Sequence, residues 1–136
     1  MTESAMPAEI VTQLKTTSHC LHSLIRLRSA LAPFRTTLHA LGKRGQEPEG
    51  RRQLLMLWRP CQEQLDFLLD KACSSQTTRL RLLREELENN LLDETFHAAA
   101  LDDLAETLEQ AGEAMLLEIE RDLRLTVARL EEAQAV

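Results

Sequence analysis

The chain has 136 residues, enough for one domain around one core, and its 22 acidic against 16 basic residues give a net charge of −6. Leucine is the commonest residue, tyrosine is absent and aromatic residues make up 3% of the chain, a composition that favours helices over sheets. No uninterrupted apolar run approaches the roughly 18 to 20 residues of a membrane span. We therefore expect a single all-α domain over residues 1–136, with no membrane span.

The charge is divided between two parts of the chain. Residues 1–84 carry thirteen Lys/Arg against seven Asp/Glu, whereas residues 85–136 carry three against fifteen. Such a division is typical of a protein whose segments pair with each other or with another molecule. Individual surface ion pairs contribute only about 0 to 1 kcal/mol, so they would orient the segments more than hold them together.

Residues 1–7 lack the basic and apolar regions of a signal peptide, so we expect a flexible N-terminus and a cytoplasmic protein. The three cysteines are too few, and odd in number, for a disulfide framework. Cys20, Cys61 and Cys73 each fall in a helical pattern where a small apolar residue would also fit. This predicts free, buried thiols.

The first predicted helix covers about residues 8–41. Its apolar residues alternate spacings of three and four, the stripe of an amphipathic helix or a coiled-coil seam. They are Leu24, Leu27, Leu31, Phe34, Leu38 and Leu41. Pro33 removes an amide donor inside this stripe, so we expect the helix to kink or restart there. Residues 42–50 contain three of the four glycines and one proline, which predicts a loop.

The second predicted helix covers about residues 51–73 and repeats the same apolar spacing around Pro60. Because the connection is short, the two helices should form an antiparallel hairpin. Trp58 lies on the second stripe and should be buried against Leu27 or Leu31. The similar patterns around the two prolines are also compatible with an internal duplication, although leucine-rich helices often match by chance.

A third helix is predicted after Ser74 and Ser75, residue types that can cap a helix N-terminus. Asn89, Asn90 and Asp93 are weak helix formers clustered near its end. Two options are open at that point. Either the helix breaks there, with Asp93 capping a new one, or it continues into the last segment.

The last predicted helix, over residues 95–133, is acidic and coiled-coil-like. Its apolar stripe has nine positions, with Gly112 where the spacing changes. A helix of this length would be roughly 58 Å long, beyond the roughly 30 Å scale of a small domain. We expect it either to bend at Gly112 or to project toward a partner. The expected fold is a helical hairpin plus one or two further helices, a three- to four-helix bundle.

This last stripe is longer than the first and second predicted helices, which each contain a proline. An apolar stripe that no other helix of the chain covers favours a partner. We therefore predict that a partner helix, or a second copy of the chain in a homo-oligomer, binds the seam. The predicted partner-binding residues are Leu108, Met115, Leu116, Ile119, Leu123, Val127 and Leu130. The alternative is that the four amphipathic segments bury one another within one chain.

A second candidate surface is basic. Arg44, Arg51, Arg52 and Arg59 gather around the predicted hairpin tip, where they could bind a polyanion such as nucleic acid. Trp58, close by in the sequence, could stack on a base. Because the chain is acidic overall, we favour the interpretation in which the acidic last helix covers these arginines.

Two histidine patterns are candidates for a metal site. His19 and His22 lie three residues apart on one helix face with Cys20 between them, but zinc needs three or four ligands. Glu94 and His97 form the E-x-x-H pair of di-iron bundles, which need that motif twice. We prefer structural or exposed histidines, and predict no metal and no cofactor.

The chain contains no nucleophile elbow, phosphate-binding loop, dinucleotide fingerprint or H-E-x-x-H motif. We therefore expect a non-enzymatic protein-protein interaction module, such as an adaptor, a small chaperone or a regulatory subunit, that binds a partner helix through its leucine-rich surface. The alternatives are a nucleic-acid-associated regulator that uses the arginine-rich face, and a metal-binding helical bundle.

Overall fold

The computed structural model describes residues 5–93 and 96–135. In chain order it contains α1 (Ala5–Leu41), the short 3-10 helix η1 (Gly42–Gln46), α2 (Pro48–Lys71), α3 (Thr77–Leu92) and α4 (Ala98–Ala135). The described residues contain no β-strand, and four α-helices account for nearly all of them. The predicted all-α class is confirmed.

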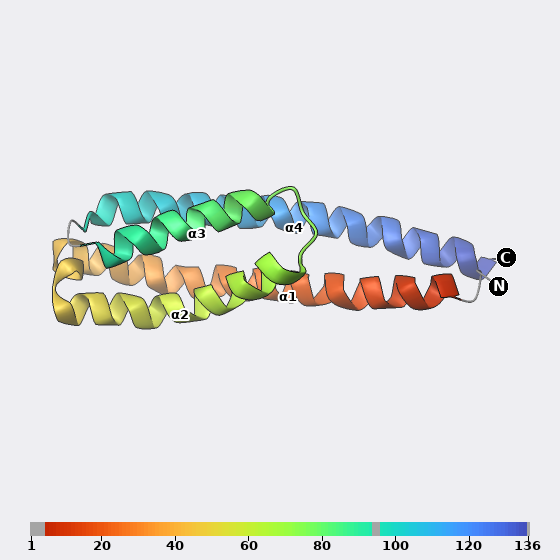
Figure 1. Ribbon diagram of the computed structural model, residues 1–136, viewed down its shortest axis with the longest axis horizontal. Helices are drawn as coiled ribbons and strands as arrows, with labels where there is room; N and C mark the ends of the chain where they lie inside the picture. The colour runs from red at the N-terminus through yellow and green to blue at the C-terminus, as the bar shows by residue number, and fades with distance from the viewer. Residues whose placement is uncertain (1–4, 94–95, 136) are drawn as a thin grey trace.

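The four α-helices run up and down beside one another (Figure 1). α1 contacts α2 and α4, and α3 closes the bundle by contacting the same two helices. α1 and α4 lie side by side along the length of the molecule, whereas α2 and α3 cover only part of it. Past the connection between α2 and α3, α1 and α4 continue as a pair. We call residues 8–14 and 123–135 the two-helix extension.

The expectation that the last helix outruns the first is wrong, because α1 has 37 residues and α4 has 38. α1 continues through Pro33. The proline removes the donor for the carbonyl oxygen of Ser29, but both residues lie on the exposed side of α1, where water can replace that donor. α4 likewise continues through Gly112. A continuous α1 therefore accompanies α4 from the bundle into the two-helix extension.

The connection between α1 and α2 is shorter than the loop predicted over residues 42–50. Gly42 adopts a φ of +52° after the end of α1, and η1 follows. Pro48 then opens α2, where its missing amide and fixed φ suit the first turn. Gly50 lies so close to η1 that a Cβ there would be 2.3 Å from the carbonyl oxygen of Arg44. This close approach requires glycine in the first turn of α2.

A break separates α3 from α4, which was one of the two options near Asp93. α3 ends at Leu92, and α4 starts as a new helix. The flexible segment predicted over residues 1–7 lies only partly within the described residues. Its residues 5–7 belong to α1, and residues 1–4 lie outside the described part of the chain.

Ser74 and Ser75 precede α3, but the N-cap position is Gln76, and no side-chain hydrogen bond caps the helix. The two serines tie the connection between α2 and α3 to α4. The backbone N–H of Gln76 donates a hydrogen bond to Ser74 Oγ at 3.0 Å. Both serine hydroxyls, together with the backbone N–H of Ser75, donate to the Glu118 carboxylate of α4. These hydrogen bonds lower the pKa of Glu118, so it accepts them as a carboxylate at neutral pH.

Trp58 lies in the core, which confirms its predicted burial. It is 3% exposed, and its ring packs on Phe34 of α1 with ring centroids 5.4 Å apart. Its Nε1 donates a hydrogen bond to Glu88 Oε1 of α3 at 3.2 Å. Leu27 and Leu31, the predicted contacts, belong to the same core cluster. Trp58 therefore links α2 to both of its neighbours.

Two of the three cysteines follow the prediction. Cys20 and Cys61 are buried, whereas Cys73 is exposed. The prediction is wrong for Cys73 because α2 ends at Lys71, which leaves this cysteine in the connection to α3. Burial raises the pKa of the Cys61 thiol to about 12 and also raises that of Cys20. Both therefore remain protonated near neutral pH, and only the thiolate binds metals well.

Candidate partner-binding groove

The structure divides the seven predicted partner-binding residues of α4 into two groups. Leu108, Met115 and Ile119 are at most 4% exposed and belong to the core cluster that includes α1. These three side chains offer a partner little or no surface while the bundle is closed. The candidate surface is corrected accordingly, and the cause is the uninterrupted α1, which covers this part of the seam.

The other four side chains are accessible. Leu116, Leu123 and Leu130 are half-buried, and Val127 is 38% exposed. The three leucines recur every seven residues, so they share one side of α4. They run from the bundle onto the two-helix extension, beyond the reach of α2 and α3.

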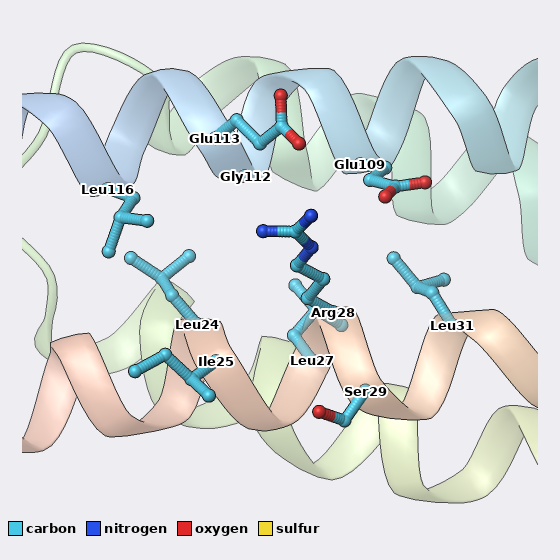
Figure 2. A pocket seen from close by; sticks show the side chains of 10 residues that line it. All are labelled: Leu24, Ile25, Leu27, Arg28, Ser29, Leu31, Glu109, Gly112, Glu113 and Leu116. Atoms are coloured by element: carbon cyan, nitrogen blue, oxygen red, sulfur yellow. The ribbon is translucent and has the colours of Figure 1, made fainter.

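Leu116 also lines a pocket between α1 and α4 (Figure 2). The pocket has a volume of about 130 Å³. Its lining consists of Leu24, Ile25, Leu27, Leu31 and Leu116, together with Arg28, Ser29, Glu109, Gly112 and Glu113. Figure 2 shows Leu24 pointing toward α4 and Leu116 pointing back toward Leu24. The pocket therefore has an aliphatic floor.

Gly112 lines the hollow, and its missing side chain leaves space there. A Cβ at this position would meet Leu24 Cδ2 at 3.9 Å and Leu27 Cδ2 at 4.0 Å, which are ordinary van der Waals contacts. Neither its neighbours nor its φ requires glycine. Glycine inside a helix is nevertheless about 1 kcal/mol less favourable than alanine. What glycine provides at position 112 is open space in the pocket, beside Leu24 and Leu27.

Charged side chains form the rim of the pocket. Figure 2 shows Arg28 of α1 extending toward α4, where Glu109 and Glu113 also line the pocket. Glu109 also belongs to an ionic cluster, in which Arg35 bonds Glu109 at 2.9 Å and Asp102 at 3.0 Å. A ligand in this groove meets an apolar floor and a rim with charges of both signs.

The ionic cluster also determines the protonation of its members. Burial alone would raise the pKa of Asp102, but the hydrogen bond and charge of Arg35, helped by His39, lower it below the usual range. His39 Nε2 lies 3.0 Å from Asp102 Oδ1. The hydrogen bond to Asp102 raises the pKa of Arg35 in turn. Arg35 and Asp102 are therefore both charged at neutral pH and join α1 to α4.

The four predicted polyanion-binding arginines lie at or near the turn between α1 and α2. Arg44 donates a hydrogen bond to a carbonyl oxygen of α1 at 3.1 Å, and Arg51 donates one to the carbonyl oxygen of Asp93 at 2.8 Å. Arg52 and Arg59 are exposed on α2. Within the described residues, no ion pair links any of the four to α4. The acidic last helix pairs with α1 instead of covering them.

Of the candidate metal ligands, His19 and His22 line one hollow, but Cys20 does not line it. His19 and His22 are exposed on α1, whereas Cys20 between them is buried in the core. In the part of the chain that the structure describes, no three His, Cys, Asp or Glu side chains form a group that could hold a metal ion. His97 is exposed, and Glu94 lies outside the described residues.

Sequence reasoning missed Ile25 and Arg28, which line the groove from α1. Ile25 is 56% exposed although it is a large apolar side chain. It immediately follows Leu24, so it lies beside the leucine stripe of α1 rather than on it. The signal in the sequence is an isoleucine beside the leucine stripe. The sequence does not show which helix flanks that side of α1, so it does not show whether Ile25 lines a groove.

No protein-family model, curated protein or solved structure matches the chain. None of the helices in the described ranges is long and apolar enough to cross a membrane.

Proposed function

We propose that the protein is a non-enzymatic interaction module that binds a helix of a partner protein in the groove between α1 and α4. The observation that carries the proposal is the apolar pocket at Gly112, from which the accessible side chains Leu116, Leu123 and Leu130 continue along α4. Helix-binding grooves take an amphipathic helix whose anchors recur at spacings of three, four and seven residues. The seven-residue spacing of the leucines suits that repeat.

The pocket suits one apolar side chain of the partner helix. Its volume of about 130 Å³ is close to the roughly 150 Å³ of an apolar cavity that holds benzene. Arg28 and Glu113 at the rim would favour a partner with polar residues of opposite charge beside its anchor. Such charges select the orientation and the partner more than they add affinity.

The two-helix extension provides the rest of the binding surface. In the bundle, α2 and α3 help to cover the apolar residues, but in the extension α1 and α4 have only each other. Val127, one turn after Leu123 on α4, is 38% exposed there. A partner helix beside this pair would remove apolar surface from water, at about 25 cal/mol per Å².

This mode of binding suits an adaptor, a small chaperone or a regulatory subunit acting in the cytoplasm. The partner is either another protein or a second copy of the chain. Bundle architecture alone does not choose among these roles, because folds of this kind carry many functions. The proposal includes no catalytic step and no cofactor.

The proposal is tested by capturing partners from the native lysate, with nuclease added, using the full chain and two single variants. Ile25→Glu places a charge at the rim of the pocket, and Leu82→Glu places one at a comparably exposed site on α3, the side chains being 56% and 59% exposed. Both variants should fold, because both sites face solvent. A partner of the groove should bind the wild type and Leu82→Glu but not Ile25→Glu. If Ile25→Glu captures the same proteins as the wild type, the groove is not the binding site.

The nucleic-acid alternative has one observation in its favour and one against it. Arg52 and Arg59 are exposed, as a phosphate-binding surface requires. Trp58 is 3% exposed and bonded to Glu88, so it is not available to stack on a base. The metal-binding alternative lacks a third ligand among the described residues. Helix binding is therefore the function that the geometry supports best.

A further inference from the structure

A second candidate surface lies on α2, apart from the groove between α1 and α4. It is a shallow hollow lined by Pro48, Arg51, Arg52, Leu55, Met56 and Arg59. It shares no lining residue with the pocket at Gly112. An inference about this surface therefore goes beyond the proposed function and is independent of it.

The hollow is strongly basic. Three of its six lining residues are arginines and none is acidic, although the chain as a whole has a net charge of −6. Arg52 and Arg59 form no ion pair with any described residue. Glu49 and Glu63 lie one turn beyond these two arginines on α2, outside the hollow. The complementary ligand is therefore acidic.

The centre of the hollow is apolar. Met56 is 69% exposed and Leu55 is 37% exposed. Both lie one turn after Arg52 and one turn before Arg59, so the arginines flank an apolar centre along the axis of α2. Methionine is flexible and polarizable, and it is common on surfaces that bind amphipathic helices. The ligand should therefore be apolar in the middle and acidic on both sides.

This combination favours an acidic peptide over a nucleic acid. Nucleic acids are bound through basic groups on their phosphates and through aromatic side chains that stack on their bases. No aromatic side chain lines the hollow. A phosphate backbone would leave Leu55 and Met56 without an apolar contact, whereas an acidic amphipathic helix would cover both.

We propose that this surface of α2 binds an acidic amphipathic helix of another protein. Arg52 and Arg59 are seven residues apart, roughly 10 Å along the helix axis. Two acidic residues seven apart on the partner match them, and apolar residues three and four positions after the first acid meet Leu55 and Met56. The pattern is the same in both chain directions, so it does not choose between parallel and antiparallel binding.

The test uses a synthetic helical peptide that repeats this pattern, with Glu as the acidic and Leu as the apolar residue. The full chain should bind it with an affinity that falls as salt rises, because screening weakens the ion pairs. A matched peptide with Lys in place of Glu should not bind. The variant Arg52→Glu/Arg59→Glu should bind the acidic peptide about tenfold or more weakly, since like charges then face each other.

Two further variants show whether the whole surface is used. Leu55→Ser/Met56→Ser should also weaken peptide binding about tenfold, because it removes the apolar centre. The matched control Arg79→Glu/Arg81→Glu reverses two charges at exposed sites on α3 and should bind like the wild type. All six substituted side chains lie on the exposed surface. Circular dichroism should therefore show an unchanged helix content in each variant.

Heparin and single-stranded DNA are the competing probes. If either binds the full chain more tightly than the acidic peptide, and Leu55→Ser/Met56→Ser retains that binding, the surface recognises phosphate or sulfate groups and the proposal is wrong. The proposal is also wrong if none of the probes binds. It is equally wrong if the α3 control loses as much peptide affinity as Arg52→Glu/Arg59→Glu.

Discussion

Gly112 allows the stability of the free protein to be separated from its binding of a partner. Gly112→Ala should raise the free energy of unfolding by about 0.5 to 1 kcal/mol, through helix propensity and the entropy of the unfolded chain. The added methyl group fits at 3.9 Å from Leu24 but occupies space in the pocket, so binding of the partner helix should weaken. Chemical denaturation and an affinity measurement check the two effects. Unchanged affinity would mean that the partner does not use the pocket.

Gly50→Ala is the matched control for that experiment. Its Cβ would approach the carbonyl oxygen of Arg44 to 2.3 Å, so the turn between α1 and α2 must shift. Gly50→Ala should lower the free energy of unfolding by about 1 to 3 kcal/mol, as overpacking does. It should leave the groove unchanged. Two glycine-to-alanine changes in one protein should therefore have opposite effects on stability.

Trp58 tests the packing of α2 against its neighbours. Trp58→Ala should lower the free energy of unfolding by about 3 to 5 kcal/mol, as large-to-small core changes do. It removes the ring that packs on Phe34 and the N–H that Glu88 accepts from. Trp58→Phe keeps an aromatic ring and should lose less. A loss below about 0.5 kcal/mol, the range of surface substitutions, would contradict the burial of this side chain.

The lowered pKa of Asp102 predicts that the stability of the fold depends on pH. Because Arg35 lowers the pKa of Asp102 in the folded state, this carboxylate stabilises the fold above its unfolded pKa of about 3.9. The stabilisation is lost as pH falls through the lower folded pKa. Asp102→Asn should therefore cost about 1 kcal/mol near pH 7 and progressively less below about pH 4. Denaturation curves check the trend, and Asp103→Asn, at the exposed neighbouring position, is the matched control.

At the scale of whole helices, the prolines show what the sequence could and could not predict. The spacing of the leucines predicts α1 and α2 and the faces that they bury. It does not decide whether Pro33 ends α1, because that depends on the environment of the carbonyl of Ser29. The carbonyl lies on an exposed side, so the helix continues. The exposure of this carbonyl lets α1 continue past Pro33 and lie along α4. The spacing of the leucines does not show that exposure.

The seam of α4 illustrates the same limit. Its spacing placed Leu108 and Met115 on one apolar face, but a stripe does not say which helix covers it, and both side chains are buried in the core instead of being open to a partner. Leu123 and Leu130 lie on or beside the same stripe and are only half-buried, because α2 and α3 do not reach them. The difference between core and candidate surface along one helix therefore comes from the lengths of its neighbours.

Leu123 and Leu130 give the test at this scale. Replacing both with Glu should abolish partner binding and leave most of the helical circular dichroism, because neither is fully buried. If the partner is a second copy of the chain, light scattering should show an oligomer for the wild type and a monomer for the variant. A monomer in both cases at micromolar concentration excludes self-association and leaves a different protein as partner. Leu82→Glu/Leu92→Glu adds the same charge on α3 and is the control.

At the scale of the whole molecule, the division of charge along the sequence does not become two faces that cover each other. α4 contributes carboxylates to Arg35 but none to the arginines of α2 among the described residues. Glu113→Gln/Glu120→Gln should therefore elute from heparin at the same salt concentration as Glu85→Gln/Glu86→Gln, which has the same net charge. Later elution of the first variant would show that α4 does shield a basic surface.

The start of α1 and the end of α4 lie at the same end of the molecule (Figure 1). A mechanical force applied across these two ends would pull α1 and α4 apart one turn of contacts at a time. It would not load all the contacts between the two helices at once. Rupture would begin near Ile10 and Thr126, the buried residues of the two-helix extension. It would reach the four-helix part last. A molecular motor that pulls these ends apart would consequently disrupt the two-helix extension, and the binding surface on it, while the four-helix part was still folded.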